Sequence, residues 1–229
     1  MIGEKEHFGI NQMRNTMFEN EQPVMYPFGP PIYQDVVPEE FIKELDRLIE
    51  ETGGKVEFDA SGLLAGRILK QTELNDVISP ALEEHLIHHC IRFNEKVHGN
   101  RVEGMTMDAI WSNIQEAREY NPPHYHTGNF SFVVYCRNDL EKFSIEELQD
   151  NPYDAPHAGS DTHTQLRKLA GLIELQYGEP NWMNWNTYQF VPKRGDIIIF
   201  PSWLRHTVYA HYEPDCVRVS VAGNVSIVG

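Results

Sequence analysis

Apolar residues recur at two different spacings, and the change of spacing divides the chain near residue 100. Before that point they recur every three or four positions, as in helices that bury one face. The first stripe follows Pro38, which suits the first position of a helix, and Gly53-Gly54 is expected to end that helix. Its members are Phe41, Ile42, Leu45, Leu48 and Ile49. A short strand is predicted before it, at residues 32–37.

A second helix is predicted to begin near Ser79-Pro80 and to continue to about Val97. Its spacing places His85 and His89 side by side, with His88 on the same helix. No acidic or cysteine partner completes a metal site there. We therefore interpret these histidines as solvated or half-buried helix side chains.

After residue 100 the apolar positions are rich in β-branched and aromatic residues, which is typical of strands. Six strands are predicted, at residues 109–115, 130–136, 172–177, 188–191, 196–200 and 217–225. Helices followed by a run of strands predict an α+β chain that is mainly β. The expected architecture is a double-stranded β-helix, or jelly roll, backed by helices.

The length of 229 residues suits a single domain with a sizeable core. We expect residues 1–229 to form one domain, in which residues 1–100 give helical and irregular support and residues 105–229 form the jelly-roll core. Residues 138–168 are polar and contain Asn151-Pro152 and Ala158-Gly159-Ser160. A stretch of that kind predicts an insertion, either a functional lid or a disordered segment.

Composition narrows the classes of partner. The formal charge of −15 repels polyphosphate, so nucleic acid is disfavoured as a partner. The three cysteines, Cys90, Cys136 and Cys216, form no CxxC pair, which predicts free thiols in a reducing compartment. The sequence contains neither a signal-peptide core nor a run of about 18 apolar residues that could cross a membrane. We expect a soluble, cytoplasmic protein, and no oligomeric state is predicted.

The candidate chemistry is concentrated in Asn121-Pro-Pro-His-Tyr-His126 and in a distal histidine, His206. Side chains two residues apart in an extended segment project to the same face, so His124 and His126 can aim two imidazoles at one point. His206 follows the apolar run 195–200 and a turn at Pro201. Three protein ligands leave positions open on a metal, which is typical of a catalytic site.

Arg218-Val-Ser220 follows twelve residues after His206. Strand alternation places Arg218 and Ser220 on one face and the flanking valines on the other. A guanidinium is costly to bury unless an anion meets it, and its fork of donors matches a carboxylate. The anion is either a carboxylate ligand or an internal Asp or Glu.

This order of motifs, His-x-(Asp or His), a distal His and then Arg-x-Ser, resembles the 2-oxoglutarate/iron(II) dioxygenase superfamily. One branch, the 2-oxoglutarate oxygenases found in bacteria and phages, is similar in four segments. These are Trp111-Ser-Asn113, His124-Tyr-His126, Ser131-Phe-Val-Val-Tyr135 and Phe200-Pro-Ser-Trp-Leu-Arg-His206. The resemblance covers roughly residues 109–225, and the first hundred residues carry no motif of the family.

The resemblance implies that His124 and His206 ligate iron(II), and that Arg218 with Ser220 binds the distal carboxylate of 2-oxoglutarate. Tyr135 matches a tyrosine that bonds this carboxylate in prolyl-hydroxylase-like members; the alternative is a core tyrosine bonded to backbone. Asn113 is a weaker candidate for the same cavity.

His126 departs from the pattern, because most of the superfamily has aspartate there. Three neutral imidazoles leave a ferrous site at a charge of +2, which a dianionic 2-oxoglutarate neutralises fully. Three imidazoles also suit zinc. Either His126 is the third ligand, or it lies off the metal and water takes its place.

We therefore expect a 2-oxoglutarate- and Fe(II)-dependent dioxygenase that uses O2, hydroxylates a small-molecule or peptidyl substrate and releases succinate and CO2. One alternative is a cupin-type three-histidine metalloenzyme that does not use 2-oxoglutarate. Cupins usually carry a glutamate shortly after the His-x-His pair, where this chain has Phe130 and Ser131. The other alternative is a catalytically silent binding or structural module of the same fold.

Overall fold

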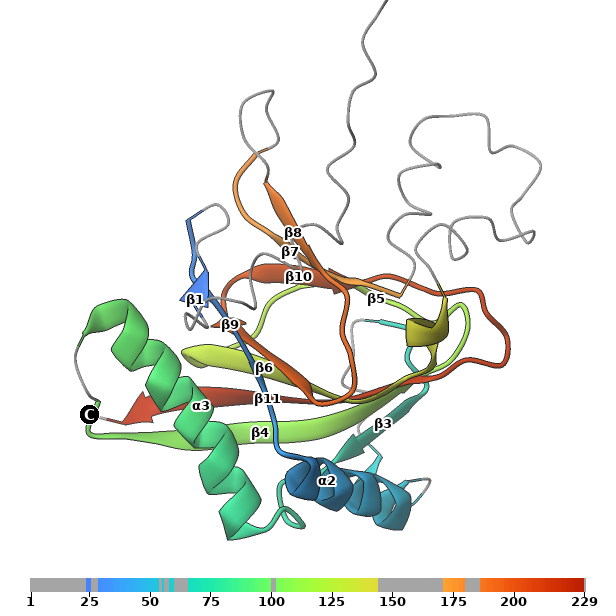
Figure 1. Cartoon of the computed structure of the whole chain (residues 1–229), viewed down its shortest axis with the longest axis horizontal. Coiled ribbons are helices and arrows are strands. Elements are labelled where there is room, and N and C mark those ends of the chain that lie inside the picture. Colours follow the sequence, from blue (N-terminus) through green and yellow to red (C-terminus); the bar gives the residue numbers. More distant parts are fainter. Residues whose placement is uncertain are drawn as a thin grey trace, which may run out of the picture.

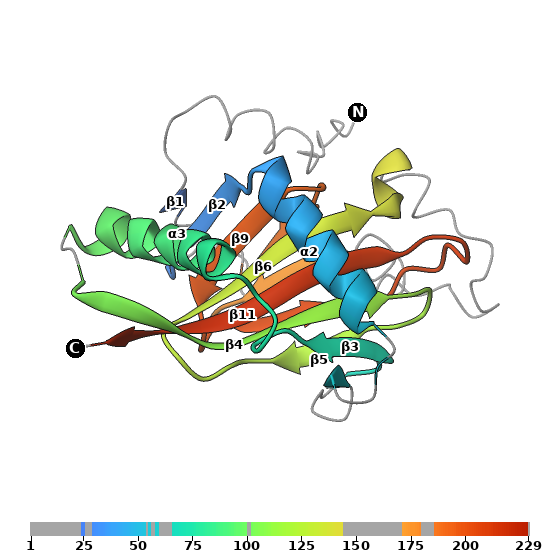
Figure 2. The same cartoon turned by 90° about the horizontal axis from the view of Figure 1, so that it is seen from below.

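Two antiparallel sheets face each other, and two helices cover the outer face of the larger sheet (Figure 1). Figure 2, seen from below, shows both helices lying in front of that sheet. The computed structural model describes residues 24–25, 29–53, 55, 58–59, 66–99, 102–143, 171–179 and 186–228. The predicted class, mainly β with helices toward the N-terminus, is confirmed.

Within these residues the larger sheet has seven strands in the order β1-β2-β9-β6-β11-β4-β3. The strands are β1 (Val24–Met25), β2 (Ile32–Val36), β3 (Lys70–Glu73), β4 (Gly104–Gln115), β6 (Phe130–Asn138), β9 (Asp196–Pro201) and β11 (Arg218–Val228). The smaller sheet has the order β5-β10-β7-β8, with β5 (Asn121–His124), β7 (Ile173–Gln176), β8 (Thr187–Phe190) and β10 (Arg205–Val208). Every predicted strand is present. β1, β3, β5 and β10 were not predicted as strands, because each has only two to four residues and so gives a weak periodic signal.

The helices begin where their capping residues indicate. Helix α2 (Glu39–Thr52) starts one residue later than expected, because Pro38 is its N-cap residue rather than its first turn. Helix α3 (Pro80–His98) has Ser79 as N-cap, whose hydroxyl accepts a hydrogen bond from the Leu82 amide. A short 3₁₀ helix, η3 (Asp139–Lys142), follows β6.

Strand β9 is buried on both faces, which explains its uninterrupted isoleucine run. Ile197 and Ile199 belong to the core between the sheet and the helices. Ile198 and Phe200 belong to a second core between the two sheets. Strand β9 therefore contributes side chains to both cores.

Strand β11 shows the alternation that was predicted from its sequence. Val221 and Val225 pack in the core beneath the helices, whereas Arg218, Ser220 and Asn224 are buried on the face toward the smaller sheet. A register shift between Asn224 and Val225 interrupts the pairing with β4 near the C-terminal end of the strand. The face predicted to carry the chemistry thus lies between the sheets.

The interpretation of the α3 histidines was wrong for His89. Its side chain is only 4% exposed, and its Nδ1 lies 3.1 Å from the Tyr33 hydroxyl, which donates to Asp35 at 2.6 Å. The acidic partner comes from β2, so helical spacing could not reveal it. His85 contributes a neighbouring Nε2 at 3.3 Å from that of His89.

Two expectations fall outside the described residues. Most of the predicted insertion, from residue 144 to 170, lies outside them, and so do residues 1–23 of the N-terminal support. No helix in the part of the chain that the structure describes is long and apolar enough to cross a membrane.

Candidate active site

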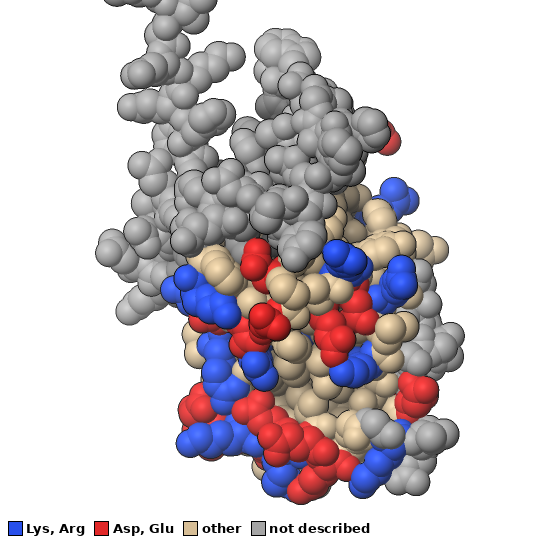
Figure 3. All heavy atoms as spheres, turned by 90° about the vertical axis from the view of Figure 1, so that its right-hand side faces the viewer, with Lys and Arg blue, Asp and Glu red and all other residues tan. Residues whose placement is uncertain are grey.

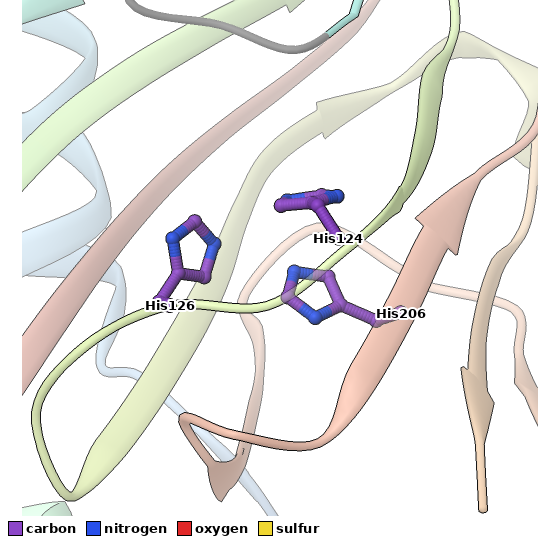
Figure 4. A group of neighbouring side chains, drawn as sticks. All are labelled: His124, His126 and His206. Carbon is purple, nitrogen blue, oxygen red and sulfur yellow. The ribbon is translucent and has the colours of Figure 1, made fainter.

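His124, His126 and His206 meet between the two sheets, and their imidazoles point toward one another (Figure 4). One nitrogen from each ring lies within 4.8 Å of the others. The ring centroids of His124 and His206 are 4.1 Å apart, and that of His126 is 4.9 Å from His124 and 5.1 Å from His206. Three imidazole donors gathered in this way suit Fe(II) or Zn²⁺.

The backbone places the three histidines by two different means. His124 and His206 are direct register partners on the antiparallel strands β5 and β10. His126 lies beyond the end of β5, in the loop before β6. Of the two histidines that were predicted to lie on one extended segment, only His124 is in a strand. The His126 amide donates to the Ser202 carbonyl at 2.9 Å, which ties this loop to the turn between β9 and β10.

Hydrogen bonds select the tautomer of two of the rings. Nδ1 of His124 lies 2.7 Å from the Pro122 carbonyl, and Nδ1 of His206 lies 3.0 Å from the Leu204 carbonyl. A carbonyl only accepts, so each Nδ1 carries the proton and each Nε2 keeps a lone pair. This is the usual arrangement of metal-binding histidines, which donate their second ring nitrogen to an acceptor.

The site holds its histidines in the neutral form. Burial lowers the pKa of His124, and it lowers the pKa of His126 to about 4 with a smaller contribution from His124. Burial also holds the pKa of His206 well below its ordinary value, with His124 adding to the effect. Neutral imidazole is the form that binds a metal.

A second group of predicted residues lies in one row across three strands of the larger sheet. Ser220 on β11 pairs with Asn113 on β4 and with Tyr135 on β6. All three line the same cavity as the histidines. Among the hydrogen bonds of the described residues, none involves the Ser220 or Tyr135 hydroxyl. These groups therefore face the cavity without a protein partner.

Arg218 lies two residues from Ser220 on the same face of β11, with 3% of its surface exposed. Its Nη1 donates to the Gly171 carbonyl, and its buried Nε has no hydrogen-bond partner. Among the described residues no acidic side chain forms an ion pair with it. Burial lowers the pKa of this guanidinium, and Tyr135, over whose ring it lies at 5.9 Å, acts in the opposite direction.

One cavity brings together all seven residues predicted from the sequence. It is also lined by residues that the sequence did not single out, among them Gln115, Asn121 and Ile173. Asn121 lies next to one of the histidines, since its Nδ2 is 3.3 Å from Nε2 of His124. Two features of the sequence could have indicated them. Gln115 lies two residues after Asn113 and so on the same face of β4, and Asn121 directly precedes Pro-Pro-His.

A separate groove of about 650 Å³ is lined by residues of β7 and β10 and of the turns next to them, several of which adjoin the histidines in sequence. It is lined by Tyr125, Tyr177 and Trp203, which are 68%, 46% and 55% exposed. Tyr125 stands between two of the histidines in sequence, and Arg205 of the groove directly precedes the third. Arg205 is exposed and forms no ion pair among the described residues.

Comparison with known proteins supports the motifs. A family described as "Putative 2OG-Fe(II) oxygenase" matches residues 109–224. That range contains all three histidines, Arg218 and Ser220. A search of curated proteins found no match.

Solved structures of similar architecture include a prolyl-4-hydroxylase from Pseudomonas putida, with 12% identity and a TM-score of 0.52 over 86% of this chain and 93% of that one. A 2OG-Fe(II) oxygenase family oxidoreductase from Burkholderia pseudomallei has 14% identity and a TM-score of 0.47, covering 84% of each chain. The viral collagen prolyl hydroxylase of Paramecium bursaria Chlorella virus-1, solved with 2OG, has 10% identity and a TM-score of 0.46, covering 86% and 96%. The first likeness confirms the predicted double-stranded β-helix fold.

Proposed function

Because this chain belongs to the 2OG-Fe(II) oxygenase family, we propose which of its residues bind the iron, the 2-oxoglutarate and the substrate. The enzyme is a dioxygenase that uses iron(II), 2-oxoglutarate and O2. Iron(II) with bound 2-oxoglutarate supplies the oxidising chemistry that hydroxylates a substrate and releases succinate and CO2. The residues of the cavity bind, orient and exclude water.

Iron(II) is assigned to His124, His126 and His206. The donor set fits the ion, because three neutral imidazoles converge and two of them present Nε2 with its lone pair. Among the described residues no carboxylate belongs to the cluster, so the three ligands leave the full charge of the metal in place. A dianionic 2-oxoglutarate then balances that charge.

2-Oxoglutarate is assigned to the row of Asn113, Ser220 and Tyr135, and Arg218 is assigned to its distal carboxylate. The observation that carries this assignment is the buried guanidinium, whose Nε is unpartnered in the same cavity as the three histidines. Such a charge is costly to bury without an anion. We expect the Ser220 and Tyr135 hydroxyls to donate to the same carboxylate, and Asn113, the register partner of Ser220, to contribute a further polar group.

The substrate is assigned to the groove of Tyr125, Tyr177 and Trp203, whose residues adjoin the histidines in sequence. Exposed aromatic rings beside an unpaired arginine suit a peptidyl or small-molecule substrate with an apolar face and an acidic group.

Acidic and basic side chains are interspersed on the face shown in Figure 3, without a basic patch of the kind that binds nucleic acid. The three cysteines are buried and unpaired, which supports a cytoplasmic location.

The test is an anaerobic titration. Purified protein is loaded with iron(II), 2-oxoglutarate is added, and the weak visible charge-transfer band of the ternary complex is recorded. Arg218→Ala should abolish the band or demand far more 2-oxoglutarate, while iron still binds. A three-histidine cupin, or a silent module, would give no band and no succinate after oxygen is admitted, and that result would overturn the assignment.

A further inference from the structure

Gln115 lies directly opposite Arg218, as its register partner on the neighbouring strand β4. Directly opposed residues in an antiparallel pair carry their side chains on the same face with Cβ atoms about 5 Å apart. Both residues line the cavity, and Gln115 is only 1% exposed.

The orientation of the Gln115 amide is determined by its neighbours. Its Nε2 donates to the Glu119 carbonyl at 2.6 Å and to the Tyr209 carbonyl at 3.1 Å. Because carbonyl oxygens only accept, the NH2 group must face them and Oε1 must point away. Oε1 is buried and has no hydrogen-bond partner.

An unpaired acceptor on Gln115 therefore stands across the strand from an unpaired donor, Nε of Arg218. 2-Oxoglutarate is a dianion with acceptor atoms alone, so Oε1 cannot bond to it directly. The two atoms are not hydrogen-bonded to each other, which leaves Nε of Arg218 available to the carboxylate. A glutamine amide that is held by two carbonyls nevertheless presents the negative end of its dipole, Oε1, to the cationic guanidinium from a fixed position, and this favours one orientation of the guanidinium.

A second route links the same two residues through the backbone. Gln115 holds the Tyr209 carbonyl, and the Tyr209 amide in turn donates to the Leu172 carbonyl at 2.9 Å. One residue further along, the Gly171 amide donates to the Ala210 carbonyl at 3.1 Å, and the Gly171 carbonyl accepts from Nη1 of Arg218. The amide of Gln115 thus anchors the segment on which Arg218 rests.

We propose that Gln115 is a positioning residue for 2-oxoglutarate, which acts by holding the guanidinium of Arg218 toward the distal carboxylate. The proposal rests on the assignment of Arg218 made above. It predicts that Gln115 affects recognition of the distal carboxylate alone. The chelating end of the keto acid and the iron site should not depend on it.

The test compares two keto acids on Gln115→Leu. 2-Oxoglutarate carries the distal carboxylate, whereas pyruvate lacks it. Each is titrated against the anaerobic iron(II) protein, and iron affinity is measured separately. We expect the dissociation constant of 2-oxoglutarate to rise about tenfold or more, because the guanidinium is no longer held in place, with that of pyruvate and of iron unchanged.

Two further variants make the result decisive. Gln115→Glu preserves the size of the side chain but sets a carboxylate opposite Arg218, so it should weaken 2-oxoglutarate more than Gln115→Leu does and should decide the matter if the leucine variant fails to fold. Combining Gln115→Leu with Arg218→Ala should cost no more than Arg218→Ala alone. Gln34→Leu is the control, since it removes another buried amide, which donates to the Tyr188 hydroxyl outside the cavity.

The outcomes separate this proposal from the function on which it rests. If the wild-type protein forms no band with 2-oxoglutarate, the assigned function is wrong. If the wild type forms the band and both Gln115 variants bind 2-oxoglutarate normally, the positioning role is wrong. Equal weakening of pyruvate, 2-oxoglutarate and iron would also overturn it, because that pattern indicates general damage to the cavity.

Discussion

His124 and His206 are direct register partners across the antiparallel strands β5 and β10. Opposed positions in a sheet hold their side chains close together without any contribution from loop conformation. His126 lies instead in a loop, and its own backbone amide donates a hydrogen bond to the Ser202 carbonyl. The three histidines are thus a rigid pair with a third member held from a neighbouring turn.

Replacing the histidines one at a time should reveal this inequality. We expect His206→Ala to weaken iron binding by about 100-fold or more, because it removes one ligand and also the strand partner that packs against a second ligand, His124. His126→Asp supplies the carboxylate common in the superfamily and should keep iron binding within about tenfold of the wild type. Iron content after dialysis measures both, and equal loss in the two variants would contradict the distinction.

Removing the hydroxyls that flank the guanidinium should have a graded effect. Ser220→Ala and Tyr135→Phe each delete one donor from the row but leave Arg218 in place. We expect each to raise the dissociation constant of 2-oxoglutarate about threefold to tenfold, as for a single hydrogen bond of about 1 kcal/mol. The charge-transfer titration measures this, and a loss as complete as that of Arg218→Ala would show that the charge is not dominant.

Gly171→Ala should disturb the anchor of Arg218. Gly171 has φ of +69°, and an added methyl would overlap Cδ1 of Leu140. We expect a loss of stability of about 1–3 kcal/mol and weaker binding of 2-oxoglutarate. Gly99→Ala is the matched control, because it has the same φ and open space around it. Denaturant midpoints should fall further for Gly171→Ala, and only that variant should affect 2-oxoglutarate.

His89 should make the fold sensitive to mild acid. Burial lowers its pKa to about 4, with Asp35 opposing the shift. As pH falls from 6.5 toward 4 the unfolded chain takes up a proton that folded His89 refuses, so the free energy of unfolding falls, by about 2 kcal/mol at pH 5.

The check is a comparison of urea unfolding at pH 7 and pH 5, without metal. His89→Gln should be less stable than the wild type at pH 7, because it disturbs the contact with Tyr33. It should nevertheless lose less stability between the two pH values. An unchanged pH dependence in this variant would assign the acid sensitivity to the other buried histidines.

The candidate residues named from the sequence line one cavity, but their arrangement in that cavity could not be predicted. His206 could be recognised because it follows a buried strand and a turn, and Arg218 because an arginine among β-branched residues needs an anion. Gln115 could not be recognised, since its importance comes from pairing with β11, and pairing register is set by contacts between distant segments.

The same limit applied to the polar residues of the fold. The acidic partner of His89 lies on β2, more than fifty residues away, so local spacing gave no sign of it. His126 was expected on an extended segment, yet the strand ends at His124 because the chain turns toward Ser202. The apolar strands were predicted correctly, because their burial follows directly from composition.

Because β9 contributes side chains to both cores, the chain cannot be shortened to its motif-bearing part without exposing apolar surface. The motif-bearing stretch, residues 109–224, supplies the cavity, but β2 and β3 flank it in the larger sheet and α2 and α3 cover its outer face. A fragment cut at residue 109 would leave Ile197 and Ile199 facing water and two strand edges unpaired. We therefore expect residues 109–224 to aggregate as an isolated fragment. The residues of the site all lie within this range, but its solubility depends on the first hundred residues, which cover its apolar face.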